Sequence, residues 1–313
     1  MRFTSTASPK ESKTLTAAFK ERYPFISVRH DTVSRRGKVR ILIAYRAGRI
    51  STDIIFGVGG TFHQWKAANA VQNLRVIPGV KKLPEQAIDP EGLWTGINTR
   101  YWCLSYNTKL VNKKELPKTW DQLINPKWGN GNLGLGNRPN LWALQLWNSE
   151  GPEWTKNFLT RIFKELKPQL RKEGMNAIGQ LVAAGEMHGA VPAGEARTKQ
   201  IALRGAPIAY TCPEPVPVAV EEAVILNKAP NTYAARIFMN WMLSKEGQIS
   251  NWVAGKIPPV RQDLMLPEFN PWPDQILGKR ISYREPGLET TALPKLYKFW
   301  NDLWLKGGGT PRR

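Results

Sequence analysis

Apolar segments that lead straight into glycine-rich loops and helices restrict the fold of this chain more than any other feature. Ile54-Ile55-Phe56 forms a continuous apolar strand of the kind found in a parallel sheet covered on both faces. Glycine-rich residues 57–61 follow it, and a helix is expected from Phe62. Residues 2–6 and 25–29 are predicted strands on either side of another helix. This alternation of strand and helix predicts an α/β fold.

Two segments far apart in the chain carry clear helix signals. Ser8-Pro9-Lys10-Glu11 fits a capping box with proline at the first helical position. The strongest helical period places apolar residues at i, i+3, i+4, i+7 and i+8, namely Ala235, Phe238, Met239, Met242 and Leu243. Tryptophans at helical core spacing are assigned to packing: Trp142, Trp147, Trp154, Trp300 and Trp304.

The length of 313 residues predicts two domains of ordinary size or one large α/β unit. Residues 92–108 are rich in strand-forming types. At the polar link 107–109 the chain is expected to pass from one domain to the other. A predicted strand at 208–212 is followed by the alternating prolines Pro213, Pro215 and Pro217. These prolines indicate a second passage.

The charge of the chain limits its functional class. Lys and Arg number 45 against 25 Asp and Glu, which gives a formal net charge of +20. Such an excess is compatible with nucleic acid, a membrane surface or acidic ligands. Even the densest basic piece, residues 35–40, interleaves apolar residues, so we interpret it as a solvated helix face. Nucleic-acid binding is kept as an alternative.

The sequence carries no catalytic, metal-binding or cofactor-binding pattern. Cys103 and Cys212 make no CxxC pair, and the three histidines are scattered. Gly129, Gly131 and Gly134 form a literal GxGxxG, but no apolar strand precedes them, so we interpret them as a glycine-rich turn. We therefore expect no catalytic residues, no metal and no cofactor.

Several segments resemble the type-2 solute-binding proteins of ABC importers, in the branch that includes ferric-ion, thiamine and sugar-phosphate binders. The segments are NTKLV at 107–111, LPKTWDQLINPKW at 116–128, KAPN at 228–231, LSKEGQ at 243–248 and PPVRQD at 258–263. Ser5-Thr6, Phe19 and Tyr23-Pro24 match the beginning of the family as well. The resemblance covers nearly the whole chain in consistent order.

The resemblance implies a two-lobed clamshell with a ligand cleft between the lobes and two hinge crossings. Lobe 1 would comprise residues 1–105 and 216–275, and lobe 2 residues 106–215 and 276–313. Such proteins are exported monomers that capture a solute in the periplasm and deliver it to a membrane permease, with no role for nucleic acid. Met1-Arg2-Phe3 begins no apolar stretch, so this location presupposes an export signal that is absent from these residues.

In open α/β sheets, ligands bind beyond the carboxyl ends of the strands. This rule selects Ser5, Thr6, Gly59, Gly60, Thr61, Asn137 and Arg138. Arg138 is the candidate for an anion, because a guanidinium can grip a carboxylate or phosphate bidentately. The hydroxyls are equally compatible with helix capping, the glycines with a tight turn, and Arg138 with a solvated surface position. One of the strand neighbours Tyr101 and Trp102 is expected to pack on the solute.

Ferric-binding relatives carry a tyrosine pair where this chain has residues 193–197. The tyrosines are absent here, and Glu195 and Arg197 stand nearby. A lone carboxylate replaces two phenolates poorly, so iron is disfavoured. We expect a small anionic organic solute that bears a carboxylate or phosphate. The alternatives are a ferric ion or other cation centred on Glu195, an enzyme built on the same fold, and a basic nucleic-acid-binding protein.

Cys103 and Cys212 stand near the two crossings. The family's hinge implies that the crossing strands lie side by side, which would bring the two cysteines within bonding distance. Export to an oxidising compartment would let a disulfide form, whereas buried free cysteines are also common in apolar strands. The sequence leaves both possibilities open.

Overall fold

The computed structural model describes residues 1–57, 61–285 and 287–310. The chain divides into two compact units, unit 1 with residues 1–99 and 220–270 and unit 2 with residues 100–219 and 271–313. It passes from unit 1 to unit 2 within β4 (Thr95–Asn107), returns within β9 (Val216–Ile225) and passes again after Asn270. The sequence-based boundaries at 105/106, 215/216 and 275/276 lie a few residues away, because two of the passages fall inside strands rather than in polar links.

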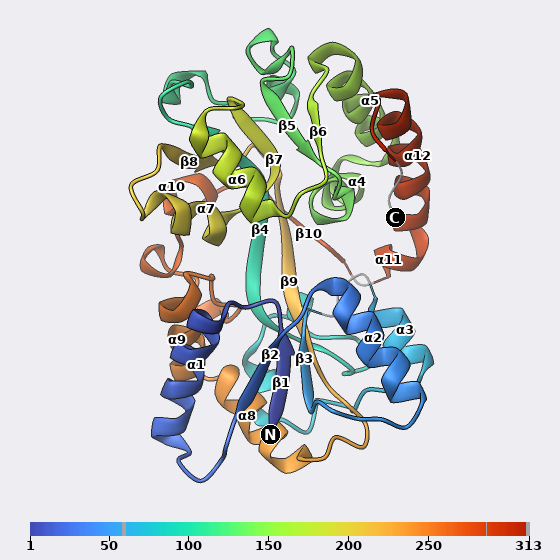
Figure 1. The fold of residues 1–313 in the computed structure, drawn as a ribbon, viewed down its shortest axis with the longest axis vertical. Helices are drawn as coiled ribbons and strands as arrows, with labels where there is room; N and C mark the ends of the chain where they lie inside the picture. The colour runs from blue at the N-terminus through green and yellow to red at the C-terminus, as the bar shows by residue number, and fades with distance from the viewer. Residues whose placement is uncertain (58–60, 286, 311–313) are drawn as a thin grey trace. The chain divides into compact units, whose positions relative to one another are not determined.

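Unit 1 is an α/β unit that begins with three strand–helix pairs. Its helices are gathered on both sides of its strands, with α1 and α9 on one side and α2 and α3 on the other (Figure 1). Besides parts of β4 and β9, its strands and α-helices are β1 (Arg2–Ser5), α1 (Pro9–Arg22), β2 (Arg29–Thr32), α2 (Arg35–Arg46), β3 (Ile54–Phe56), α3 (Phe62–Ala67), α8 (Thr232–Met242) and α9 (Lys245–Gly255). The predicted α/β fold is confirmed.

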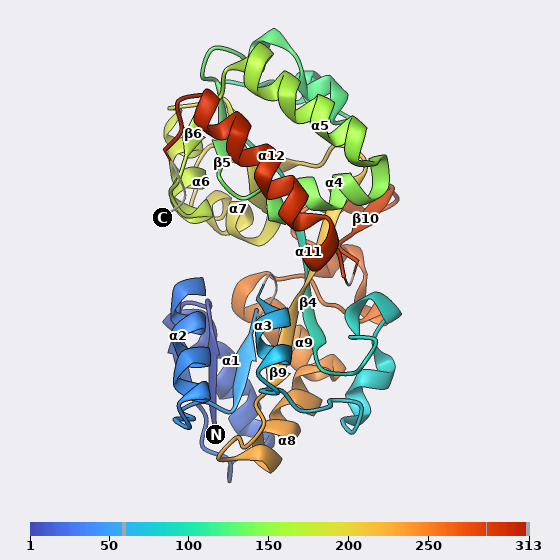
Figure 2. The same ribbon diagram turned by 90° about the vertical axis from the view of Figure 1, so that its right-hand side faces the viewer.

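Unit 2 is also α/β, and its last long helix runs beside α5 (Figure 2). Besides parts of β4 and β9, its strands and α-helices are β5 (Leu133–Gly136), α4 (Ala143–Glu150), α5 (Pro152–Arg161), β6 (Gln169–Arg171), α6 (Met175–Ala184), β7 (Gly189–Gly194), α7 (Glu195–Ala202), β8 (Ile208–Thr211), α10 (Pro273–Ile276), β10 (Ile281–Tyr283), α11 (Leu288–Thr291) and α12 (Leu293–Lys306). No helix in the described ranges is long and apolar enough to cross a membrane.

Three parallel strands organise unit 1. β1 pairs with β2, with Arg2 opposite Arg29, and with β3, with Phe3 opposite Ile54. β9 closes the other side of β3 in the antiparallel direction. The second strand therefore begins at Arg29, whereas residues 25–29 were predicted as a strand. The difference arises because a turn precedes β2, in which Ile26 N–H donates to the Tyr23 carbonyl.

Unit 2 has its own parallel set. β5 lies between β6 and β7 and is parallel to both, while β4 runs antiparallel to β7 and to β8. The carboxyl ends of β7, β5 and β6 therefore lie at one edge of this sheet, followed by residues 195–197, 137–140 and 172–174. We call this the unit 2 edge. The carboxyl ends of β1, β2 and β3, with the residues that follow them, form the unit 1 edge.

Each unit buries an apolar core of its own. The unit 1 core draws on helices from both faces of its strands, including Phe19 of α1 and Trp65 of α3, which are both fully buried. The unit 2 core is rich in tryptophan, and the packing role predicted for Trp142, Trp147, Trp300 and Trp304 is confirmed because all four are buried. The predicted capping box of α1 is also present, with Ser8 and Glu11 exchanging hydrogen bonds.

A disulfide joins Cys103 and Cys212 inside unit 2, with a Cα–Cα distance of 5.0 Å. Its cause is the antiparallel pairing of β4 with β8, in which Leu104 lies opposite Thr211. Cys212, which directly follows Thr211 at the end of β8, therefore lies beside Cys103. The pairing that the sequence left open is formed, and the partner strand of β4 at this point is β8 rather than the second crossing strand.

Candidate functional site

Four arginines gather at the unit 2 edge. Arg138 follows β5, Arg171 ends β6 and Arg197 lies in the first turn of α7. Arg100 joins them through strand register, because β4 runs antiparallel to β7 with Trp102 opposite Gly194. The residue two positions before Trp102 thus lies beyond the end of β7, beside the start of α7. This edge therefore presents a concentration of guanidinium groups.

The arginines are held by partners from the same unit. Arg197 Nη1 donates to Gln200 at 2.7 Å, and Arg171 Nη2 lies 3.2 Å from a Glu173 oxygen. The Nε of Arg171 is buried and has no hydrogen-bond partner among the described residues. Its unused donor and the fixed neighbours suit a ligand with several acceptor oxygens.

The loop that carries Arg138 is anchored by its neighbour Asn137. The Asn137 backbone N–H donates to the Arg171 carbonyl at 3.0 Å. The Asn137 side-chain oxygen accepts from Trp300 Nε1 at 2.9 Å. The Arg138 N–H donates to the Gly136 carbonyl at 2.6 Å, which turns the chain sharply after β5. Asn137 thus positions the half-buried Arg138 from within the core.

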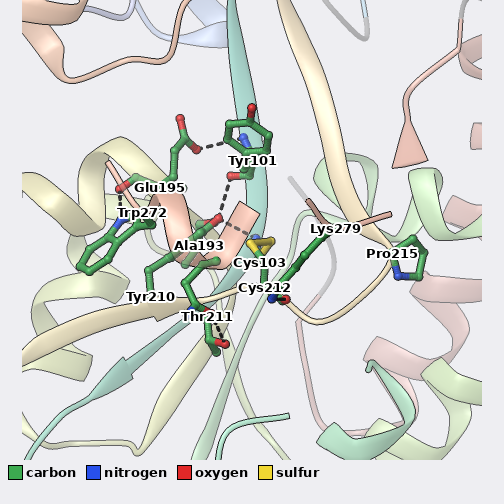
Figure 3. The surroundings of a disulfide bond; sticks show 12 residues. Tyr101, Cys103, Ala193, Glu195, Tyr210, Thr211, Cys212, Pro215, Trp272 and Lys279 are labelled. Atoms are coloured by element: carbon green, nitrogen blue, oxygen red, sulfur yellow. Dashed lines mark hydrogen bonds between the residues drawn. A yellow bond between two sulfur atoms is a disulfide. The ribbon is translucent and has the colours of Figure 1, made fainter. Parts of the chain in front are cut away.

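Glu195 is the first residue of α7 and is only 1% exposed. One carboxylate oxygen accepts from the Tyr101 N–H at 3.0 Å (Figure 3). The other carboxylate oxygen lies 4.0 Å from Arg100 Nη1. Trp272 Nε1 donates to the Glu195 carbonyl at 3.0 Å. Burial raises the pKa of Glu195 to about 7, against the opposing effects of Arg100 and the backbone amides at the helix start.

Tyr101 and Trp102 take opposite faces of β4. Tyr101 is 4% exposed and packs in a small cluster around the disulfide, whereas Trp102 is half-buried against the unit 2 core. The Tyr210 hydroxyl accepts from Cys103 N–H at 3.0 Å and shares its proton between the carbonyls of Tyr101 and Ala193 (Figure 3). Burial raises the pKa of both Tyr101 and Tyr210, so both phenols are neutral at physiological pH.

Glu195 should make folding less favourable as the pH rises. An unfolded glutamate has a pKa near 4.5 and the folded one near 7, so between these values the folded state holds a proton that the unfolded state has lost. Between about pH 4.5 and pH 7, the titration of Glu195 should lower the free energy of unfolding by roughly 2–4 kcal/mol. Below about pH 4.5, Glu195 is protonated in both states and its whole contribution to stability is present.

Urea unfolding of the wild type and of Glu195→Gln at pH 4.5 and pH 8 checks this expectation, because the variant lacks the titrating group. The variant should gain stability relative to the wild type at pH 8. Glu186→Gln removes an exposed carboxyl of the same unit and serves as the control. Equal pH dependence in the wild type and Glu195→Gln would contradict the assignment.

The unit 1 edge is polar and mostly buried. Ser5 ends β1, is 3% exposed and lies 2.8 Å from His30 Nε2, while its hydroxyl also accepts from Ala7 N–H at 3.0 Å. Burial lowers the pKa of His30, although Asp31 and Glu11 act in the opposite direction. Thr6 is exposed and Thr61 is buried at the start of α3, while Gly59 and Gly60 lie outside the described residues.

A buried lysine supports the last loop of this edge. Lys38 is 4% exposed and donates to the carbonyls of Phe56 at 2.6 Å and Gly57 at 3.0 Å. Gly57 has φ of +71°, and a Cβ there would lie 2.8 Å from the lysine Nζ. Glu221 closes the group, accepting from Asn98 Nδ2 at 3.0 Å. The interpretation of residues 35–40 as a solvated face is therefore wrong at Lys38.

The structure brings the predicted site residues together in two groups. Ser5, Thr6 and Thr61 share the unit 1 edge, and Tyr101, Trp102, Asn137, Arg138, Glu195 and Arg197 lie at or beside the unit 2 edge. Sequence reasoning missed His30, Arg100 and Arg171, whose positions depend on strand register. It also missed Lys38, which α2 carries to the carbonyls at the end of β3. Within the described parts of the chain, no group of three or more His, Cys, Asp or Glu residues could hold a metal ion.

Comparison with known proteins places this geometry among solute-binding folds. The family model described as bacterial extracellular solute-binding protein matches residues 14–274. None of the curated proteins matches the sequence.

Solved structures match nearly the whole chain at low identity. Iron-bound HitA from Pseudomonas aeruginosa has a TM-score of 0.78 at 19% identity, over 97% of this chain and 98% of that chain. AfuA from Actinobacillus pleuropneumoniae with fructose-6-phosphate bound has a TM-score of 0.75 at 15% identity, over 98% of each chain. A substrate-binding protein of an ABC transporter from Agrobacterium tumefaciens has a TM-score of 0.79 at 15% identity, over 97% of this chain and 94% of that chain. These similarities establish the shared fold.

Proposed function

This chain belongs to the family of bacterial extracellular solute-binding proteins, and we propose that it captures a small anionic organic solute for the membrane permease of an ABC importer. The solute bears a carboxylate or a phosphate. The protein works as a monomer in the periplasm, without a cofactor, catalytic activity or a nucleic-acid partner.

The concentration of arginines at the unit 2 edge is the observation that supports this proposal. Arg100, Arg138, Arg171 and Arg197 come from four paired strands, β4 to β7, or from the residues that follow them, so strand pairing brings them to one edge of the sheet. Guanidinium groups suit carboxylate and phosphate because their planar donors match two acceptor oxygens at once.

The ferric or cation alternative has weaker support from the same geometry. Its centre would be Glu195, which is almost fully buried and has Arg100 Nη1 4.0 Å away. A cation placed there would be repelled by the guanidinium and would need further acidic ligands. HitA binds iron and AfuA fructose-6-phosphate on this fold, so the fold is compatible with both classes of ligand.

Replacing Arg138 by alanine should weaken binding of the anionic solute by about 10- to 100-fold, the range expected when a charge-assisted hydrogen bond is lost. The fold should persist, because Asn137 rather than Arg138 anchors the loop to the core. The solute is first found by a thermal-shift screen of organic phosphates, carboxylates, neutral sugars and ferric citrate, since 100-fold excess over Kd stabilises by about 2.7 kcal/mol.

Calorimetry then compares the wild type with Arg138→Ala. Arg204→Ala is the matched control, an exposed arginine of unit 2 that follows the far end of α7. Unchanged affinity in Arg138→Ala would remove this residue from the site. Stabilisation by ferric ion alone, or tight salt-sensitive binding to duplex DNA, would overturn the proposed function.

A further inference from the structure

The pair formed by Glu195 and Arg100 is not a close ion pair. The guanidinium Nη1 lies 4.0 Å from the carboxylate Oε1, beyond hydrogen-bond distance. Oε1 is buried and has no hydrogen-bond partner among the described residues, while Oε2 accepts from the Tyr101 N–H at 3.0 Å. A buried carboxylate with one oxygen left without a donor is costly in its charged form.

Arg100 connects this buried acid to the unit 2 edge. Its side chain is 20% exposed, against 1% for Glu195, so the guanidinium is the more accessible member of the pair. Register places it beyond the end of β7, on the same edge as Arg138. Arg100 is therefore able to meet a solute anion while it faces Glu195 from the other side.

We propose that Arg100 binds the solute anion and that Glu195 takes up a proton from solvent when the anion binds, so that capture of the solute is coupled to protonation. The inference rests on the proposed function of the unit 2 edge. Without the proton, two negative charges would share one guanidinium in a poorly solvated site. Protonation of Glu195 removes one of them, so the proton and the anion each raise the affinity of the protein for the other.

Among the side chains around Glu195, only Glu195 itself is expected to change its charge near neutral pH. From β4 it is faced by Arg100, and from β8 by Tyr210, whose pKa burial raises. Tyr101 of β4 and Tyr283 of β10 also have raised pKa values and are neutral at physiological pH. Trp272 is not titratable and donates its indole N–H to the Glu195 carbonyl (Figure 3). The burial that raises the pKa of Glu195 to about 7 places its titration within the physiological range.

The test uses sulfate as the probe anion, because sulfate keeps its full charge from pH 5 to 9 and any pH dependence then belongs to the protein. Calorimetry at pH 6 and pH 8.5, in two buffers of different ionisation enthalpy, gives the affinity and the number of protons taken up. The wild type should bind sulfate about tenfold or more tightly at the lower pH and take up a proton above neutrality. Glu195→Gln should bind with nearly the same affinity at both pH values and take up no proton.

Glu186→Gln is the control and should keep the wild-type pH profile. An unchanged profile in Glu195→Gln would assign the proton to another group and overturn the proposal, as would pH-independent binding by the wild type. Absence of sulfate binding at pH 6, or unaltered binding in Arg100→Gln, would overturn it as well, because Arg100 must hold the anion. The proposed function stands or falls separately, on the screen of organic solutes.

Discussion

Replacing Gly247 by alanine should lower the free energy of unfolding by about 3 kcal/mol, in the upper range for overpacking a buried site. Gly247 is buried in the first turn of α9, and an added Cβ would lie 2.0 Å from the Trp241 carbonyl oxygen and 2.8 Å from the Met242 Cα. These are backbone atoms at the end of α8, so no side-chain rotation can relieve the contact. Only a shift of one helix against the other makes room.

Two further facts set the sign of this effect. Alanine favours a helix over glycine by about 1 kcal/mol, which opposes the loss but is smaller than it. A shift of α9 would also disturb Gln248, whose side chain donates to the Ile97 carbonyl at 2.8 Å and accepts from Val260 N–H at 2.8 Å. The backbone overlap and the disturbed Gln248 hydrogen bonds both destabilise the fold, and together they should outweigh the higher helix propensity of alanine.

Gly179→Ala is the matched control for urea unfolding. Gly179 is also a buried helix residue, but a Cβ there meets only the Ile201 Cδ1 at 2.8 Å, the end of a side chain that can move. This variant should stay within about 1 kcal/mol of the wild type. Similar stabilities for Gly247→Ala and the wild type would show that α8 and α9 are not held as tightly as these contacts indicate.

The sequence predicted the helices and strands correctly where their formation depends on residues within one short segment. The apolar run at Ile54-Ile55-Phe56 and the capping box at Ser8 both produced the expected strand and helix start, because strand burial and N-capping depend on adjacent residues. The segment 25–29 failed, since its apolar residues serve a turn, and Phe25 is 78% exposed. Which of two similar short segments becomes the strand is decided by pairing with β1.

The site was less accessible to sequence reasoning, because it depends on contacts between distant segments. Arg138 was found from its position after a predicted strand. Arg100 lies in the middle of β4, and only the register of β4 on β7 brings it to the unit 2 edge. Lys38 stands in a basic segment, yet two carbonyls at the end of β3 hold it in the core. Both examples are pairings that no local pattern encodes.

Removal of the disulfide should destabilise this protein strongly. Cys103 and Cys212 are separated by 109 positions in the sequence, and the chain-entropy model assigns a loop of about this length up to ~4.7 kcal/mol. Both cysteines are fully buried, so replacement by alanine leaves little new surface exposed but loses some packing. We expect Cys103→Ala with Cys212→Ala to lower the free energy of unfolding by about 3–5 kcal/mol.

Without the disulfide, the local structure should weaken first in the hydrogen bonds that support the unit 2 edge. Cys103 N–H donates to the Tyr210 hydroxyl, which also donates to the carbonyls of Tyr101 and Ala193, just before Glu195. Urea unfolding of the double variant and hydrogen exchange of the Tyr101 amide measure the global and the local effect. Alkylation of the denatured, unreduced wild type should label no thiol, as expected for a protein of an extracellular family. Two labelled thiols per chain, or a double variant as stable as the wild type, would show that β4 and β8 are held by their backbone pairing alone.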